Sequence, residues 1–340
     1  MREGIDRKRL VFKDDYVYLN RNMVLYEHSA EMYNLLLESF KREDLHQYPD
    51  MASTYRALGD HLNVSTDKIC ITRGVEGAIK QAFETLNLFG ESVGLLLPNY
   101  AMYHVYAKIY GANLVPVEGE APDYKITVEQ IKEIIPRVKV LFLDNPKTHL
   151  PNHFTHEELD QIVEYCKIYG VILFLDEVYA GWEYETYLPK LGRHNNLIIS
   201  SSFSKSGFPS IKTGWSVANE KLKKQLETTR LSYELDYFSC KSLEFIIKNK
   251  DYLDALKAHV LNIKHRWYKE LLKNKEFKIY SSKAYVLRLF SEDKELVKKT
   301  YHNLYLKKIV VNLINDTNLV FSVSTCKEVE RIIFNELKSK

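Results

Sequence analysis

This 340-residue sequence lacks any apolar run near the roughly 20 residues that a membrane-spanning helix needs. Its first residues, MREGIDRKRLVFKDD, are charged from the second position and contain no apolar stretch typical of a secretory signal. Cysteine is scarce, and the four residues form no C-x-x-C pair and have no histidine at metal-ligand spacing: Cys70, Cys166, Cys240 and Cys326. We therefore expect a cytoplasmic protein with reduced thiols and no metal site.

A large excess of charge of one sign is also absent. The 48 Lys+Arg and 45 Asp+Glu leave a net charge of +3, too small to favour nucleic acid or an anionic membrane as partner. Glycine (13) and proline (9) are few, and no Gly/Pro/Ser-rich linker, internal repeat or low-complexity segment interrupts the chain. With 45% apolar residues, the chain can bury one large core or two adjoining ones.

Short β-branched runs alternate with amphipathic stretches from about residue 65 to 220. Near-continuous apolar runs such as VKVLFL and VILFL are typical of a sheet covered on both faces, and the alternation favours parallel strands. The predicted strands are Lys68–Thr72, Val93–Leu97, Leu114–Val117, Val138–Leu143, Val171–Leu175, Leu197–Ser201 and Gly214–Ala218. The predicted helices are Val75–Phe89, Tyr103–Tyr110, Val128–Ile135 and His156–Tyr169. We predict an α/β fold with a mainly parallel seven-stranded sheet.

The pattern changes after about residue 220, where Lys-rich helical stretches precede short strands. The later predicted elements are strands at Ala284–Leu289, Ile309–Asn312 and Val320–Val323, and a helix at Lys327–Lys338. We predict a large domain over residues 41–235 and a small α+β domain over 236–340, which residues 1–40 join.

Polar residues stand at the carboxyl ends of the predicted parallel strands, where ligands of such sheets bind. Gly74 opens a helix whose free N–H groups can hold a phosphate, Asp176 ends a buried strand, and Lys205 follows the next one. Pyridoxal phosphate (PLP) requires a lysine to form an imine, an acid to keep its ring nitrogen protonated, and an anion site. Each feature alone has a plainer explanation, because Asp176 can cap a turn and Lys205 can be an ordinary loop lysine.

At these residues the sequence resembles the fold-type I, class I/II aminotransferases, most closely the histidinol-phosphate aminotransferase branch. Matching segments occur in the family's order at Tyr48–Asp50, Thr72–Ile79, Pro98–Ala112, Phe174–Trp182 and Ser202–Trp215. The resemblance runs from about Leu19 to Thr325. It implies the aspartate-aminotransferase fold and PLP as cofactor.

The resemblance also implies a role for individual residues. Lys205 would form the imine with PLP and later move the substrate proton, Asp176 would pair with the ring nitrogen, and Tyr179 would donate to the ring 3-oxygen. Tyr100 would stack on the ring. The backbone of Gly74, Val75 and Glu76, the hydroxyls of Ser202 and Ser204, and Lys212 would bind the phosphate. Tyr48 would reach that phosphate from a second subunit, which implies a homodimer with shared sites.

The sequence departs from the family pattern at several of these positions. Thr148 stands where an asparagine contacts the PLP oxygen, and Lys212 stands for a phosphate-binding arginine, so it keeps the charge without the fork. Val320 and Asn312 replace two arginines, one of which clamps the substrate carboxylate in the family. Four cations could replace them by rough position, although each could instead be a solvated side chain: Lys147, His149, Lys283 and Arg288.

The sequence thus predicts a PLP-dependent aminotransferase acting on small molecules. The amino donor could be glutamate, and the acceptor would be a carbonyl compound without the usual carboxylate handle, with phosphorylated or sugar-derived molecules as candidates. Two alternatives remain open: a PLP-dependent decarboxylase of a phosphorylated amino acid, and a relative that binds ligand without turnover.

Overall fold

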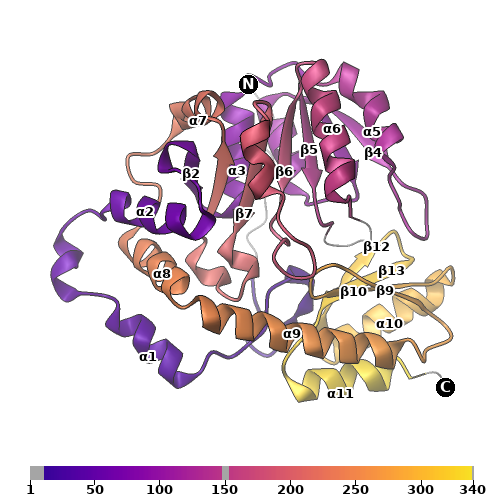
Figure 1. Ribbon diagram of the computed structural model, residues 1–340. Coiled ribbons are helices and arrows are strands. Elements are labelled where there is room, and N and C mark those ends of the chain that lie inside the picture. The colour runs from indigo at the N-terminus through magenta and orange to yellow at the C-terminus, as the bar shows by residue number, and fades with distance from the viewer. Residues whose placement is uncertain (1–10, 148–152, 339–340) are drawn as a thin grey trace.

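The computed structural model describes residues 11–147 and 153–338. A seven-stranded sheet forms one body of the molecule, and a smaller antiparallel sheet lies beside it, below the large sheet in Figure 1. The large sheet has the order β2-β8-β7-β6-β5-β3-β4. Its strands are β2 (Ile69–Thr72), β3 (Ser92–Leu97), β4 (Asn113–Glu118), β5 (Val140–Asp144), β6 (Ile172–Asp176), β7 (Leu197–Ser202) and β8 (Gly214–Ala218).

Five neighbouring strands of this sheet, β4, β3, β5, β6 and β7, are parallel. β8 runs antiparallel to β7, and β2 antiparallel to β8. The chain returns from β7 to β8 through residues 203–213 without a crossover α-helix, and a connection of this kind joins antiparallel strands. The prediction of seven strands in a mainly parallel sheet is confirmed.

Apolar side chains alternate between the two faces of the large sheet. Leu141 and Leu143 belong to one buried cluster and Val140 and Phe142 to another, as the two-residue period of a strand requires. The first cluster lies under α2 (Met51–Leu62), α5 (Val128–Ile134), α6 (His156–Ile168) and α8 (Tyr237–Lys248). The second lies under α3 (Gly74–Thr85), α4 (Met102–Tyr110) and α7 (Glu220–Leu226). The sheet is therefore covered on both faces.

The smaller sheet has the order β12-β13-β10-β9 and is antiparallel throughout. Its strands are β9 (Lys278–Ser281), β10 (Val286–Phe290), β12 (Asn312–Ile314) and β13 (Asn318–Ser322). Trp267 of the long helix α9 (Lys250–Leu271) is fully buried in the cluster on one face, together with Phe321. The remaining helices are α1 (Ala30–Glu38), α10 (Lys294–Leu306) and α11 (Lys327–Glu336).

The N-terminal segment packs against this smaller unit. β1 (Val17–Tyr18) pairs with β11 (Ile309–Val310), and Leu25 forms a bridge with Ser324. The single strand expected at Ile309–Asn312 is thus two strands, because β11 pairs with β1 and β12 pairs with β13. The sequence pattern also did not reveal β9, where Ile279 is the one buried residue and no regular alternation marks the strand.

Within residues 11–147 and 153–338, no helix is long and apolar enough to cross a membrane. No group of three or more potential metal ligands occurs in the same ranges. The four cysteines are free thiols, of which three are buried and Cys326 is exposed.

Candidate active site

The carboxyl ends of β5, β6 and β7 bring the first site residues together. Asp176, the last residue of β6, is 6% exposed. Its Oδ2 accepts a hydrogen bond from the Tyr103 hydroxyl, and its Oδ1 accepts one from the Val178 N–H, both at 3.0 Å. Burial raises the pKa of Asp176 to about 7, and the negative charge of Asp144, its register partner on β5, adds to the rise. A cationic ring nitrogen beside this carboxyl group would favour its ionised form.

Lys205 ends the short turn that follows β7. Its Nζ donates to the backbone carbonyls of Arg21 and Asn22, each at 2.9 Å, and lies 5.9 Å from the centre of the Tyr179 ring. Burial, followed by the positive charge of Lys212, lowers the pKa of Lys205 to about 8. A lowered amine pKa increases the fraction of neutral, nucleophilic lysine at physiological pH.

Tyr179 lies beside this lysine. Its hydroxyl accepts a hydrogen bond from Asn22 Nδ2 at 3.3 Å, and the Asn22 carbonyl also accepts one from the Tyr285 hydroxyl at 2.8 Å. Asn22 therefore contacts Lys205, Tyr179 and Tyr285, the residue that directly precedes β10. Its own Oδ1 is buried and has no partner within the described chain.

The start of α3 forms a cradle with the end of β7. Gly74 begins the helix with a φ of +68°, in the left-handed region that favours glycine. A Cβ built on Gly74 would lie 3.7 Å from Ser202 Oγ and 3.9 Å from Ser204 Oγ. Gly214 packs closely against Gly74, because a Cβ built on Gly214 would lie 2.6 Å from the Gly74 Cα. The helix N-terminus and both hydroxyls therefore converge on one spot.

The two serines differ in how their hydroxyls are used. Ser202 Oγ donates to the Thr213 carbonyl at 2.8 Å and accepts from the Ser204 N–H at 3.0 Å. Ser204 Oγ is buried and has no partner among the described residues. A phosphate at the start of α3 would supply that missing acceptor and would be stabilised by the free N–H groups of the helix.

Glu76 organises the outer part of this cradle. Its carboxylate accepts hydrogen bonds from the hydroxyls of Tyr100 and Tyr106, each at 3.3 Å, and lies 3.9 Å from Lys212 Nζ. Tyr100 is 49% exposed, so its ring is available at the mouth of the site. The ion pair with Glu76 keeps Lys212 near the cradle, although the lysine side chain is mostly exposed.

Taken together, these groups fit PLP: an orphan hydroxyl and a helix N-terminus for its phosphate, a buried acid for its ring nitrogen, and a lysine of lowered pKa for its aldehyde. Two further residues, Tyr48 and Thr148, were expected at the site. Tyr48 is 76% exposed and stacks on Tyr233 with ring centres 4.5 Å apart. Thr148 lies outside the described residues, as does His149.

Two residues at the site were not expected from the sequence. Tyr103, which holds Asp176, stands three positions after Tyr100 on the same segment, and that helical spacing is the signal that could have found it. Asn22 carried no signal, because it reaches Lys205 and Tyr179 through tertiary contacts across 183 and 157 positions.

The substrate side lacks the two expected arginines, as the sequence indicated. Val320 is fully buried, and Asn312 Nδ2 donates to the Asn20 carbonyl at 3.0 Å. Lys147 and Arg288 are each 3% exposed, so the interpretation of these two as solvated side chains is wrong. Lys147 lies three residues after the end of β5, and Arg288 lies within β10. Lys283 is partly buried.

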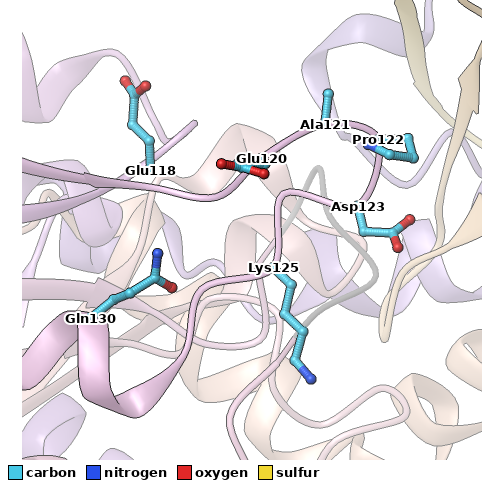
Figure 2. A pocket seen from close by; sticks show the side chains of 7 residues that line it. All are labelled: Glu118, Glu120, Ala121, Pro122, Asp123, Lys125 and Gln130. Atoms are coloured by element: carbon cyan, nitrogen blue, oxygen red, sulfur yellow. The ribbon is translucent and has the colours of Figure 1, made fainter.

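A hollow of about 390 Å³ lies elsewhere, on the loop between β4 and α5 (Figure 2). It is lined by Glu118, Glu120, Ala121, Pro122, Asp123, Lys125 and Gln130. Three of these are carboxylates, and none is a residue expected to bind the cofactor. We therefore do not place the active site there.

Comparison with known proteins bears on the family and the fold. The sequence model of the family "Aminotransferase class I and II" matches residues 14–332. Histidinol-phosphate aminotransferase from Crocosphaera subtropica is 25% identical over 335 residues, which cover 96% of this chain and 93% of that protein.

Two solved structures are similar along almost the whole chain. Histidinol-phosphate aminotransferase from Sinorhizobium meliloti, in complex with pyridoxal-5'-phosphate, has a TM-score of 0.83 at 16% identity and covers 95% of this chain and 91% of its own. L-threonine-O-3-phosphate decarboxylase from Porphyromonas gingivalis has a TM-score of 0.80 at 13% identity, with 95% and 98% covered. These likenesses confirm the predicted fold.

Proposed function

The chain belongs to the class I and II aminotransferases, PLP-dependent enzymes, and from that membership we propose how its own residues carry out amino transfer. PLP, when bound, supplies an electron-withdrawing ring that stabilises negative charge at the substrate α-carbon. The observation that carries the proposal is the meeting of Lys205, Asp176 and the Gly74 cradle at one edge of the sheet.

We propose that Lys205 has two tasks. Its neutral amine would hold the aldehyde group of PLP when the cofactor is bound, and the same amine, when free, would accept and release the α-proton of the substrate. The carbonyls of Arg21 and Asn22, each 2.9 Å from Nζ, hold the free amine in place between these tasks. A pKa of about 8 suits both, because the group can accept and release a proton near neutral pH.

Asp176 and Tyr179 would each hold one part of the cofactor ring. The Asp176 carboxylate would accept the N–H of the ring nitrogen, and Tyr103 and Val178 keep its two oxygens directed. Tyr179 would donate to the ring 3-oxygen, with Asn22 fixing the phenol. The Gly74–Glu76 backbone, Ser202, Ser204 and Lys212 would bind the phosphate, and Tyr100 would cover the ring.

The chemical class of the substrates belongs to this proposal. We propose glutamate as one amino donor, and a small phosphorylated or sugar-derived carbonyl compound as acceptor. The relatives named histidinol-phosphate aminotransferase support a phosphorylated substrate. Decarboxylation is the second candidate. It is supported by the fold likeness to the decarboxylase and by the buried Val320 of this chain, which stands where the family has its carboxylate-binding arginine.

We also propose a homodimer with shared sites. A set of exposed large apolar side chains, which we call the arm patch, lies on α1, the segment after it and the region around α8: Tyr33, Leu35, Leu37, Leu45, Tyr48, Leu231, Tyr233 and Phe238. In Figure 1, α1 runs along the outside of the molecule, away from both sheets. Exposed apolar side chains that gather on neighbouring segments are typical of interaction surfaces.

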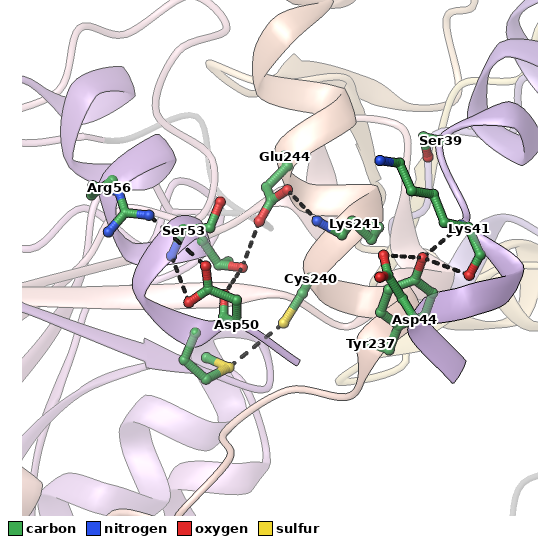
Figure 3. A network of polar contacts seen from close by, with 12 residues as sticks. Ser39, Lys41, Asp44, Asp50, Ser53, Arg56, Tyr237, Cys240, Lys241 and Glu244 are labelled. Carbon is green, nitrogen blue, oxygen red and sulfur yellow. Dashed lines mark hydrogen bonds and ion pairs between the residues drawn. The ribbon is translucent and has the colours of Figure 1, made fainter. Parts of the chain in front are cut away.

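Residues 41–54, which follow α1, are attached to α8 by polar contacts (Figure 3). The Lys41 N–H donates to the Tyr237 hydroxyl at 2.7 Å, and this hydroxyl lies 3.3 Å from Asp44 Oδ2. On the same helix, Glu244 accepts from the Thr54 hydroxyl at 2.9 Å. These contacts attach residues 41–54 to α8 and support the proposal that the arm patch binds a second subunit.

The domain limits 1–40, 41–235 and 236–340 and a cytoplasmic location stay predictions.

The deciding experiment is a spectral screen of the purified holoenzyme with a panel of amino donors. Conversion of the cofactor absorbance to its amine form, with release of a keto acid, would support transamination. Amine release without a keto product would identify the decarboxylase instead. The Lys205→Ala variant should fold, lose the absorbance of the covalently bound cofactor and lose turnover; normal turnover in this variant would contradict the assignment of the lysine.

A further inference from the structure

Arg288 lies in the middle of β10 and shares a row with three residues of the neighbouring strands. The register pairs Arg288 with Val320 on β13 and Tyr280 on β9, and Val320 with Asn312 on β12. Residues directly opposite on antiparallel strands project from the same face of the sheet. Arg288 therefore shares its face with the two positions, Val320 and Asn312, that lack a cation.

This face of the small sheet is turned toward the catalytic lysine. Ser322 Oγ donates to the Leu19 carbonyl at 3.1 Å, and Asn312 Nδ2 to the Asn20 carbonyl at 3.0 Å. The next two carbonyls of that segment accept the hydrogen bonds of Lys205. Four consecutive residues, 19–22, thus link the face that carries Arg288 to the amine of Lys205.

One nitrogen of the Arg288 guanidinium is anchored by two hydrogen bonds to the described chain. Nη1 donates to the Pro122 carbonyl at 2.7 Å and to Asn318 Oδ1 at 3.1 Å. The rings of Tyr280 and Tyr124 lie 4.0 and 5.4 Å from its Cζ, which holds the planar group by cation–π contact. These contacts come from both sheets. Tyr280 and Asn318 belong to the small sheet, whereas Pro122 and Tyr124 belong to the loop that follows β4 of the large sheet.

The other edge of the guanidinium is unused. Nε and Nη2 are buried and have no hydrogen-bond partner in the part of the chain that the structure describes. These two nitrogens present the parallel N–H pair that binds a carboxylate or phosphate in bidentate fashion. Arg288 is 3% exposed, and burying such donors without an acceptor is costly.

Neighbouring carboxylates do not occupy this edge. Arg288 forms no ion pair with a carboxylate of residues 11–147 and 153–338. Asp123, the acid whose charge acts on it, accepts from the Tyr280 hydroxyl at 2.6 Å and from Lys278 Nζ at 3.4 Å. The acidic hollow of Figure 2 lies on the same loop and would repel an anion, so the Lys205 side is the favourable approach.

We propose that the Nε–Nη2 edge of Arg288 binds the oxyanion of the substrate, a carboxylate or a phosphate ester, in place of the cations absent at Val320 and Asn312. This inference rests on the proposed function, because it deepens the substrate class of the same site. Arg288 binds the anion that positions the substrate, and Lys205 acts on the carbon to be changed. Arg288 therefore affects the affinity for the substrate more than the rate of the chemical step.

The test is a calorimetric titration of the holoenzyme with inorganic phosphate and, separately, with glutarate. Arg288→Met removes the fork and should weaken binding of the preferred anion by about 10- to 100-fold, whereas Arg288→Lys keeps the charge and should lie between. Lys278→Met is the matched control: it removes a nearby cation outside the proposed contact and should change affinity less than threefold. The anion that binds more tightly to the wild-type protein shows whether Arg288 prefers a phosphate or a carboxylate.

Kinetics of the same variants separate positioning from folding. With an active substrate pair, Arg288→Met should raise KM at least tenfold and change kcat little. Equal anion affinity in wild type and Arg288→Met, or equal losses in Arg288→Met and Lys278→Met, would overturn the proposal. If Arg288→Met does not fold, Arg288→Lys decides, since unchanged affinity there refutes the fork. Absence of any half-reaction in wild type would instead refute the proposed function, while the titration would still test Arg288.

Discussion

The Tyr103 hydroxyl donates a hydrogen bond to Asp176 Oδ2 at 3.0 Å, with both side chains buried. Asp176 is also held by the Val178 N–H, so both carboxylate oxygens are directed before any cofactor arrives. The hydrogen bond from Tyr103 favours the ionised form of Asp176, against the burial that raises its pKa to about 7. Tyr103 is thus a positioning residue for the acid that would face the ring nitrogen.

Removing the Tyr103 hydroxyl should raise the pKa of Asp176 further. Hydrogen bonds to charged groups contribute about 1.5–3 kcal/mol, so Tyr103→Phe should move the acid limb of the activity–pH profile upward by about one pH unit or more. The control is Tyr106→Phe, whose hydroxyl contacts Glu76 instead of Asp176. An acid limb that shifts equally in both variants would show that Tyr103 does not act through Asp176.

The lowered pKa of Lys205 predicts how the cofactor-free protein captures PLP. Only the neutral amine attacks the aldehyde, so the rate of covalent attachment should rise with pH and level off above about 8, near the pKa of Lys205. An ordinary lysine would keep gaining rate up to about pH 10.5. Stopped-flow absorbance between pH 6.5 and 10 measures this profile.

The positive charge of Lys212 is one cause of that lowered pKa, after burial. Lys212→Gln should therefore shift the midpoint of the capture profile to higher pH. A midpoint that stays in place, or moves down, would show that Lys212 does not act on the Lys205 amine.

Gly214→Ala tests the cradle for the phosphate. The new Cβ would lie 2.6 Å from the Gly74 Cα, and because the obstacle is backbone, the start of α3 has to move. We expect PLP affinity to fall at least tenfold, which corresponds to about 1.4 kcal/mol. Gly192→Ala is the control, since a Cβ there meets no atom within 4 Å. A fluorescence titration with PLP should leave the control unchanged; unaltered affinity in Gly214→Ala would count against the cradle.

The arm patch predicts the oligomeric state. Leu45→Lys places a charge on an exposed apolar side chain of the patch and should convert a dimer to monomers in sedimentation velocity. Leu306→Lys, on α10 and 66% exposed, serves as the control and should leave assembly unchanged. A wild-type protein that is monomeric and fully active at nanomolar concentration would refute both the dimer and the shared site of Tyr48.

The amino-acid pattern is enough to predict the succession of strands and helices along the chain and the residues at the strand ends. Apolar periodicity located all seven strands of the large sheet, with Gly214–Ala218 matching β8 residue for residue. Lys205 and Asp176 could be placed at one edge because parallel strands bring their carboxyl ends together, a consequence of topology that a sequence pattern carries.

Which side chains meet depends on the packing of the folded chain. Tyr103 reaches Asp176 across 73 positions, Asn22 reaches Lys205 across 183, and Arg288 is buried against a loop 166 positions away. No periodicity encodes such pairs, because they depend on how two sheets and the N-terminal segment pack. The burial that lowers the pKa of Lys205 and raises that of Asp176 has the same origin, since desolvation belongs to the folded arrangement and not to the residue type.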